Sequence, residues 1–385
     1  MKKGRLTLPI PEAIVVKLCV LKLVLLSLVS IVIGCSSSNS ANPASVLIFS
    51  TDYGLGVING ATNGPDRHAA DTDDAYAVTL ALQANLDIQG IITSFGNNKA
   101  QPSFESARRG LAILGFDKDI LRIGAEGFLD ALPVRFEPLG GEPAVFCVND
   151  GVRLMRDVLD TNASGMVTLI ALGPFTDIAC LQRAFPDSFN KLREIVGLVG
   201  SRDGKPVLQG IDVVDFNFAM DPTALGLVLQ QTEVAFTAIM FEVSQFGILP
   251  TGVIDYWAAG GASLEQQFYG QASQAHAQYW SAIFSQTDGQ ALFDAHTIFY
   301  LLNPQLYMCT DNMHGAAVVG GYPDTSAATT KNFFTVTPEP VQRPQDATVY
   351  TGTVRGCTSF VDPDSVTLLE ESVQASVKRY QGADS

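Results

Sequence analysis

Basic residues are scarce in this chain of 385 residues. Lys and Arg number 24 against 39 Asp and Glu, which gives a net charge of −15 and a pI of about 4.6. A protein that binds a nucleic-acid backbone needs a surplus of positive charge, so this composition argues against such a partner. The negative charge does not by itself identify an acidic active site, because solubility alone explains it.

The N-terminal region lacks an apolar run long enough to span a membrane. Residues 23–33 are apolar, whereas a spanning helix needs about 20 residues. The run follows several Lys residues and ends in Val-Ile-Gly-Cys35, which resembles the lipobox of bacterial lipoproteins. We expect a lipoprotein signal peptide in residues 1–35, lipidation at Cys35, a flexible tether in 36–44 and a folded domain in 45–385. An ordinary signal peptide or an uncleaved anchor is the alternative.

Closely spaced cysteine pairs are also absent, and this argues against a zinc site. Four cysteines lie in the expected domain: Cys147, Cys180, Cys309 and Cys357. In an oxidising compartment they allow one or two disulfides, and Cys309 with Cys357 is the pairing we expect. Buried free thiols are the alternative.

The part of the chain that follows alternates apolar, strand-like runs with helical patterns. This alternation, without internal repeats or domain linkers, predicts a single α/β domain with an open, mostly parallel sheet flanked by helices. The expected strands are residues 45–50, 86–95, 167–172, 194–200, 234–243 and 348–354. The expected helices are residues 103–114, 175–184, 261–284, 290–302, 364–380 and one that begins at Asp221-Pro222.

Acidic residues gather where the first expected strand ends. Asp52 follows residues 45–50 directly, and Asp71, Asp73 and Asp74 open the next apolar segment, with Asp66 in the loop between. Ligands of open α/β sheets bind beyond the carboxyl ends of strands. Carboxylates crowded there are tolerable when Ca²⁺, Mg²⁺ or a helix N-terminus supplies positive charge. The alternative is that one Asp caps the helix and the others are solvated.

Four more segments place polar residues near strand ends or helix starts. They are Gly96-Asn97, the Leu172–Asp177 turn, Asp215 with Asn217, and Asp294. On an extended stretch, Asp215 and Asn217 would face the same way. Each segment has a plainer interpretation as a turn, a solvated loop or a helix cap.

In this order, the segments resemble the inosine–uridine-preferring nucleoside hydrolase family. That family opens with Asp-Pro-Gly-x-Asp-Asp-Ala and continues with Gly-Asn, Gly-Pro-Leu-Thr-Asn, Glu-Phe-Asn-x-x-x-Asp-Pro and a late His-Asp pair. The resemblance spans about residues 45–362 and ends at Arg355-Gly356-Cys357-Thr358 with Asp362. It implies a nucleoside-hydrolase-like fold and Ca²⁺-dependent hydrolysis of the N-glycosidic bond of a nucleoside.

The resemblance also implies a role for each matched residue. Asp52 would bind Ca²⁺ and act as the catalytic base on water. The remaining metal ligands would be Asp74, Asp294 and the backbone carbonyl of Leu172. The sugar hydroxyls would be held by Asp73, Asn97, Asp215 and Asn217. The chemistry is consistent, because Ca²⁺ takes about six to eight oxygen ligands and carboxylates stabilise an oxocarbenium-like transition state.

Three departures from the family pattern are visible. Asp52 and Asp73 are 21 residues apart instead of four, so residues 55–72 form an insert, which is either a lid or a surface loop, and Asp71 is an alternative ligand to Asp52. Phe293 stands where many members carry a His that protonates the leaving base. Either His276, Tyr279 or Trp280 supplies or supports that step, or the substrate needs no such acid. An ordinary helix residue is the plainer interpretation of both His276 and His296. Gln209 stands where the family has a sugar-binding Asn.

The leading hypothesis is thus a Ca²⁺-dependent enzyme that acts on a small-molecule nucleoside. It would be lipid-anchored to the bacterial cell envelope, on the periplasmic or extracellular face, with no other contact to the membrane. The sequence is compatible with a homo-oligomer. The competing hypothesis is a catalytically altered or inactive sugar- or nucleoside-binding lipoprotein of the same fold.

Overall fold

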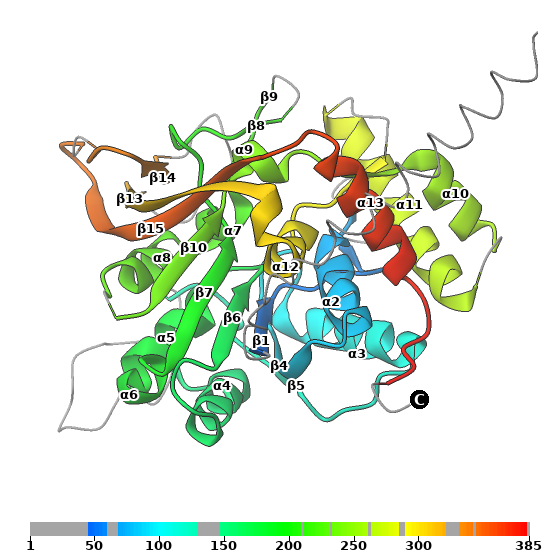
Figure 1. The fold of residues 1–385 in the computed structure, drawn as a ribbon, viewed down its shortest axis with the longest axis horizontal. Coiled ribbons are helices and arrows are strands. Elements are labelled where there is room, and N and C mark those ends of the chain that lie inside the picture. The colour runs from blue at the N-terminus through cyan, green and yellow to red at the C-terminus, as the bar shows by residue number, and fades with distance from the viewer. Residues whose placement is uncertain are drawn as a thin grey trace, which may run out of the picture. The chain divides into compact units, whose positions relative to one another are not determined.

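A nine-stranded sheet forms the centre of the domain in this computed structural model (Figure 1). The structure describes residues 45–59, 68–129, 147–208, 211–231, 233–260, 263–284, 289–320, 331–341 and 344–382. The predicted signal peptide, tether and lipidated Cys35 therefore lie outside the described residues, as do Asp66 and Gln209. Among the described residues, no helix is both long and apolar enough to cross a membrane.

The order in which the chain adds strands to the sheet changes side at β1, near the middle of the sheet. The order is β14-β13-β15-β10-β7-β6-β1-β4-β5. All pairs from β15 to β5 are parallel, and β13 is antiparallel to both of its neighbours. The chain proceeds from β1 outward through β4 and β5, then returns to β6 on the other side of β1. Ligands bind at such a switch point, beyond the carboxyl ends of the two strands.

The strands of this sheet are β1 (Val46–Thr51), β4 (Asp87–Thr93), β5 (Leu121–Ile123), β6 (Val167–Ala171), β7 (Leu192–Leu198), β10 (Ala235–Ile239), β13 (Tyr307–Val319), β14 (Phe333–Thr337) and β15 (Thr348–Phe360). Three antiparallel two-stranded pairs lie outside it among the described residues: β2 (Ile58–Asn59) with β3 (His68–Ala69), β8 (Val207–Leu208) with β9 (Ile211–Asp212), and β11 (Ile248–Pro250) with β12 (Gly289–Ala291).

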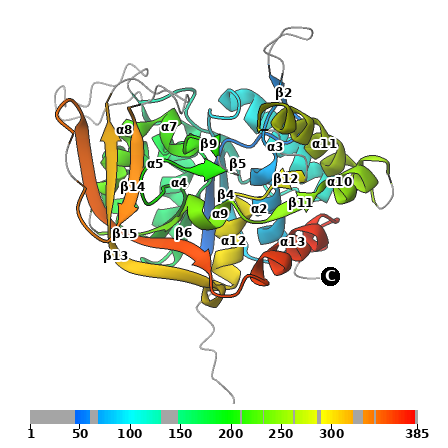
Figure 2. The same cartoon turned by 90° about the horizontal axis from the view of Figure 1, so that it is seen from above.

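Two hydrophobic cores cover the two faces of the sheet. Along β1, Leu47 and Phe49 belong to one core and Val46 and Ile48 to the other, because successive side chains of a strand point to opposite faces. The first core is closed mainly by α2 (Asp73–Gln83), α3 (Ala100–Leu114), α10 (Thr251–Ala258), α11 (Leu264–Phe284), α12 (Ala295–Leu302) and α13 (Ser365–Ser376). The second is closed mainly by α4 (Asp150–Thr161), α5 (Thr176–Ala184) and α8 (Pro222–Leu229) (Figure 2). Short helical turns complete the domain: α6 (Pro186–Phe189), α7 (Phe216–Met220), α9 (Phe241–Ser244) and the 3-10 helix η2 (Pro304–Leu306).

The predicted α/β fold with a mostly parallel sheet is confirmed. Three local predictions were wrong. Residues 290–302 are not one helix, because β12 pairs with β11 before α12 begins at Ala295. Residues 234–243 contain β10, which ends at Ile239, and then α9. Asp215 and Asn217 do not share an extended stretch, because Asp215 caps α7 and Asn217 lies inside that helix.

Two disulfides form within the domain. Cys309 on β13 is the register partner of Cys357 on β15, and the two are bonded as expected. The bond between Cys147 and Cys180 of α5 was not predicted. Both disulfides are consistent with an oxidising compartment.

Candidate active site

A cavity of about 520 Å³ lies beyond the carboxyl ends of the parallel strands. Asp52 reaches it from the end of β1, and Leu172 from the end of β6, which are the two strands at the switch point. The other predicted site residues that line the cavity are Asp73, Asn97, Asp215, Asn217 and Asp294. The fold therefore brings together residues that are more than 200 positions apart in the sequence.

Asp52 is held tightly by the backbone around it. Its side chain is 1% exposed, and its Oδ2 accepts a hydrogen bond from the backbone N–H of Asn97 at 2.6 Å. Gly96 has a φ of +145° and packs so close that a Cβ there would clash with the Asp52 carboxylate. A Cβ on Gly173 would lie 3.0 Å from Asp52 Oδ1. Both glycines thus allow the backbone to approach this carboxylate.

Three further carboxylates converge beside Asp52. Asp73 and Asp74 begin α2, Asp294 immediately precedes α12, and one oxygen of each lies within 4.8 Å of the other two. The backbone N–H of Asp294 donates to Asp73 Oδ2 at 3.0 Å, which joins the starts of the two helices. The hydroxyl of Thr51 donates to Asp74 Oδ1. This role of Thr51 could not be predicted, because Thr51 looks like an ordinary strand residue at the sequence level.

Several carboxylate oxygens in this cluster are buried without a hydrogen-bond partner. They are Asp52 Oδ1, Asp74 Oδ2 and Asp294 Oδ1. Buried polar atoms are almost always satisfied, and a buried charge without a partner is costly. Carboxylate oxygens are the ligands that hard divalent cations prefer. The donor set therefore fits a divalent cation, with Asp52, Asp73, Asp74 and Asp294 available to hold it.

Burial and mutual repulsion make it difficult to ionise these acids together. Burial raises the pKa of Asp52 well above its usual range, and the charge of Asp74 raises it further. Burial and the neighbouring carboxylates act in the same direction on Asp73 and Asp294. Burial also raises the pKa of Asp74 to about 7, although the Thr51 hydrogen bond partly offsets the effect. A bound cation would remove the repulsion and favour the ionised forms.

Asp71, the alternative ligand, is occupied by hydrogen bonds. Its Oδ1 accepts from the backbone N–H groups of Thr72 and Asp73, at 2.6 and 3.3 Å, and from Nε2 of Gln290 at 3.1 Å. In this arrangement Asp71 positions the start of α2. Gln290 was missed at the sequence level, because residues 290–302 were assigned to a helix.

The sugar-binding residues predicted from the sequence lie on two sides of the cavity. Asn97 is half-buried after β4, and its carbonyl accepts from Nδ2 of Asn59 at 2.8 Å. On the other side, Asp215 accepts from the backbone N–H groups of Gly200 and Phe218, at 2.5 and 3.1 Å. Burial raises the pKa of Asp215 to about 6. Nδ2 of Asn217 donates to the carbonyl of Leu198 at 3.0 Å.

The profile of the inosine-uridine preferring nucleoside hydrolase family matches residues 69–375. This chain belongs to that family. Among its relatives is the pyrimidine-specific ribonucleoside hydrolase RihA of Enterobacter sp. (strain 638). The two are 26% identical over 285 residues, which cover 69% of this chain and 86% of the relative.

Solved structures of nucleoside hydrolases share the fold. A plant nucleoside hydrolase superposes with a TM-score of 0.63 at 17% identity, over 86% of this chain and 100% of the plant chain. The purine-preferring ribonucleoside hydrolase of Gardnerella vaginalis gives a TM-score of 0.63 at 16% identity, over 87% and 99% of the two chains. As a member of this family, the protein is an N-glycosyl hydrolase that acts on ribonucleosides. Enzymes of the family use a metal ion, and the buried Asp cluster is a place where it could bind.

The residues at two of the departures from the family pattern, the insert and Phe293, line the cavity in this nucleoside hydrolase. The described part of the insert reaches the cavity, which His68, Ala69 and Asp71 help to line. Phe293 also lines the cavity, as do His276, Tyr279 and Trp280 of α11.

His296, by contrast, is fully buried in the first core. Its Nδ1 lies 3.0 Å from the Tyr307 hydroxyl, and its Nε2 lies 2.5 Å from the carbonyl of Phe246. Burial lowers its pKa to about 4, so this nucleoside hydrolase uses His296 as a structural residue.

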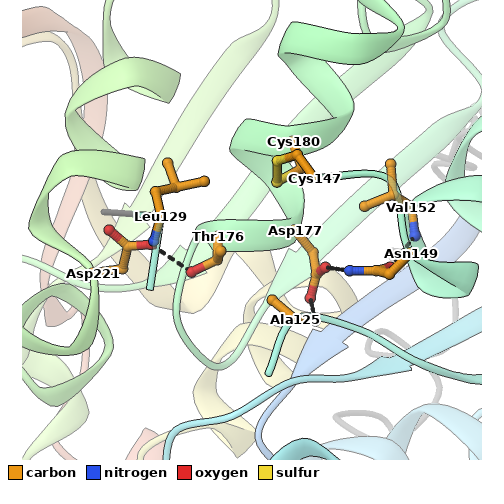
Figure 3. The surroundings of a disulfide bond; sticks show 9 residues. All are labelled: Ala125, Leu129, Cys147, Asn149, Val152, Thr176, Asp177, Cys180 and Asp221. Carbon is orange, nitrogen blue, oxygen red and sulfur yellow. Dashed lines mark hydrogen bonds between the residues drawn. A yellow bond between two sulfur atoms is a disulfide. The ribbon is translucent and has the colours of Figure 1, made fainter. Parts of the chain in front are cut away.

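A second group of buried acids at the same edge of the sheet is satisfied by hydrogen bonds (Figure 3). Asp177 accepts from Nδ2 of Asn149 at 2.6 Å and from the backbone N–H of Ala125 at 2.9 Å. Asp221 accepts from the Thr176 hydroxyl at 2.6 Å, from Leu129 N–H at 2.9 Å and from Ala224 N–H at 3.1 Å. These acids hold loops together, in contrast to the cluster around Asp52, in which three carboxylate oxygens lack a hydrogen-bond partner.

Proposed function

We propose that this protein is a Ca²⁺-dependent nucleoside hydrolase that cleaves a ribonucleoside into its free base and ribose. The observation that supports it best is the set of three partnerless carboxylate oxygens, which belong to Asp52, Asp74 and Asp294. Asp52 and Asp294 line the cavity, and Asp74 is in the group of close carboxylates that it forms with Asp73 and Asp294. A binding protein has no need for so many uncompensated buried charges. Ca²⁺ accepts more oxygen ligands, in more variable geometry, than Mg²⁺ does, and this suits four carboxylates with a backbone carbonyl nearby.

The residues of the cation site would be Asp52, Asp74, Asp294 and the carbonyl of Leu172, with Asp73 beside them. When bound, the cation would lower the pKa of a coordinated water and neutralise the carboxylates. Asp52 is the proposed base, because it lines the cavity, its Oδ1 has no hydrogen-bond partner and its Oδ2 is held by the Asn97 N–H. In this role Asp52 accepts the proton of the water that attacks the anomeric carbon of the sugar.

The sugar would lie between the two sides of the cavity. Asp73 and Asn97 would bind its hydroxyls from one side, and Asp215 and Asn217 from the other. Both carboxylates are held in place, Asp73 by the Asp294 N–H and Asp215 by Gly200 and Phe218. Carboxylates fixed around the ring would stabilise the positive charge that develops as the N-glycosidic bond breaks.

Base release from a panel of nucleosides, measured on the purified protein with and without EDTA, tests this proposal. We expect turnover that EDTA abolishes and added Ca²⁺ restores more fully than Mg²⁺, together with bound calcium in a metal analysis of the protein. Turnover that is insensitive to EDTA would refute the cation dependence. Ribose or nucleoside binding without any turnover would favour the second candidate, a catalytically altered binding protein.

That second candidate is favoured by one observation, namely Phe293. It stands directly before Asp294, where a proton-donating His would be expected from the family pattern, and a phenyl ring cannot donate a proton.

For the location, we propose a lipid anchor at Cys35 in the bacterial cell envelope. The two disulfides support an oxidising compartment. Cell fractionation tests this location. We expect a Cys35→Ser variant to leave the membrane fraction, and an unchanged distribution of the variant between the fractions would refute the lipid anchor.

A further inference from the structure

The insert, residues 55–72, is fixed to the domain at its base. Gly54 precedes it, and a Cβ on Gly54 would clash with the backbone oxygen of Asp71, so the chain leaves and returns at the same place. Leu55 is fully buried in the first core, and its carbonyl accepts a hydrogen bond from the Ser106 hydroxyl at 2.6 Å. The strands β2 and β3 therefore extend from an anchored base.

The β2–β3 pair is linked to the turn after β4 by the side chain of Asn59. Asn59 of β2 is the register partner of His68 on β3, and its Nδ2 lies 3.3 Å from Nε2 of His68. The same Nδ2 donates to the carbonyl of Asn97 at 2.8 Å. An amide nitrogen carries two hydrogens, so Asn59 can serve both partners at once.

The backbone of Asn97 is consequently held from two sides. Its N–H donates to Oδ2 of Asp52 at 2.6 Å, and its carbonyl accepts from Asn59. These bonds involve only the backbone of Asn97, which leaves its side chain to the cavity that it lines. The preceding residue, Gly96, has a φ of +145° and no Cβ to restrict it, so this turn depends on contacts from outside to fix its position.

On its other side, the β2–β3 pair rests on α11. The ring of His68 stacks on that of Tyr279, with the centroids 5.0 Å apart and the planes 28° from parallel. The carbonyl of Ala69 lies 3.3 Å from Nδ1 of His276. Because α11 is a helix of 21 residues, it gives the pair a long support.

We propose that the β2–β3 pair is a brace that positions the turn at Asn97, with Asn59 as the positioning residue. The brace fixes the Asp52 carboxylate towards the attacking water and the Asn97 side chain towards the sugar. The inference rests on the proposed function. It assigns the insert a role that differs from both a lid and a plain surface loop, because the pair is bonded to the turn and to α11.

The kinetic test compares substitutions of two neighbouring residues on β2. Asn59→Leu keeps about the size and shape of the side chain but removes the donor. It should lower kcat/KM for the best nucleoside of the panel about ten- to hundredfold, mainly through kcat, because a catalytic group displaced by about 1 Å can cost that much. Asn59→Gln keeps an amide donor and should recover most of the rate. The matched control is Ile58→Thr, which should leave kcat/KM unchanged, because Ile58 is 43% exposed and outside the cavity lining.

Hydrogen exchange, followed by mass spectrometry, measures the turn without catalysis. The N–H of Asn97 is bonded to Asp52, so its exchange requires the turn to open locally. Asn59→Leu should speed exchange in a peptide that covers residues 95–99 by about three- to tenfold, which corresponds to the loss of one hydrogen bond. Exchange in β6 should not change.

Three results would overturn the inference. They are wild-type kcat/KM in a folded Asn59→Leu variant, an equal loss in Ile58→Thr, and unchanged exchange in residues 95–99. Failure of the proposed function looks different. In that case the wild type hydrolyses no nucleoside, while Asn59→Leu still speeds exchange at the turn, and the brace remains a property of the fold.

Discussion

Replacing Asp74 with Asn should stabilise the protein when no divalent cation is present and destabilise it relative to the wild type when Ca²⁺ is added. The side chain of Asp74 is fully buried, and its Oδ2 has no hydrogen-bond partner. Because its pKa is about 7 instead of 3.8, ionising it at pH 8 costs the folded, cation-free protein about 4 kcal/mol, at about 1.4 kcal/mol per pKa unit. An Asn at this position carries no charge and can still accept the hydrogen bond from Thr51.

The sign of the pH dependence follows from the raised pKa. A carboxyl whose pKa is higher in the folded than in the unfolded state stabilises the fold below about pH 4, and this stability is lost as the pH rises towards 7. The cation-free wild type should therefore lose stability between pH 4 and pH 7. The Asp74→Asn variant should lose less, so the two proteins should differ little at pH 4 and by about 2–4 kcal/mol at pH 8.

Urea unfolding followed by circular dichroism, in EDTA and in CaCl₂, measures these differences directly. Ca²⁺ should raise the free energy of unfolding of the wild type at pH 8 and have little effect on Asp74→Asn. Asp177→Asn is a suitable control, because Asp177 is equally buried at the same edge of the sheet but is satisfied by Asn149 and Ala125. Its effect should be the same with and without Ca²⁺. A variant Asp74→Asn that is less stable than the wild type in EDTA at pH 8 would refute the reasoning.

Three further predictions concern the cation site and the scaffold that supports it. Asp294→Asn should lower kcat/KM at least about 100-fold with unchanged circular dichroism, since metal sites contribute several kcal/mol to transition-state stabilisation; unchanged kinetics would contradict the metal assignment. Asp221→Ala should cost at least about 3 kcal/mol of stability in urea, because Leu129 N–H and two more buried donors lose their acceptor; a loss below 1 kcal/mol would argue against this account. Replacing Cys147 and Cys180 with Ala should cost about 3–4 kcal/mol, given their separation of 33 residues; an unchanged urea midpoint would exclude a stabilising role.

The sequence was sufficient to predict most of the parallel part of the central sheet, because these strands are buried on both faces. Runs such as Val46–Thr51 and Val167–Ala171 are apolar along nearly their whole length, and few other structures have that pattern. The start of α8 was also predictable, since Asp221 caps the helix and Pro222 fits its first turn.

Among the strands that the sequence did not reveal, β5, β12 and β14 have three to five residues, whereas β13 has 13 and is antiparallel to both of its neighbours. β12 has three residues, too few to show a period, and it exists because it pairs with β11 about 40 positions earlier. The Cys147–Cys180 bond was not predicted, because the sequence left open whether one or two disulfides form, and cysteine spacing does not decide between a second disulfide and buried free thiols.

For the candidate site, the sequence identified the acids but not the groups that hold them. Asp52, Asp74 and Asp294 were expected to converge. In the structure Asp52 and Asp294 line one cavity, and Asp74 and Asp294 belong, with Asp73, to one group of close carboxylates. The family pattern drew attention to them, since each alone resembles a helix cap or a turn. Thr51 and Gln290, which fix Asp74 and Asp71, could not be recognised, because their contacts depend on packing between segments far apart in the chain.

The hydrogen bond between the Asp294 N–H and Asp73 spans 221 residues of sequence. Neither half of the polypeptide, therefore, carries a complete set of carboxylates, and a truncated product that stops before residue 294 would lack a member of the set however well its first strands folded. Cation affinity would then report on the finished tertiary structure, so that titration with calcium during refolding would reveal when the last part of the chain has docked onto the first.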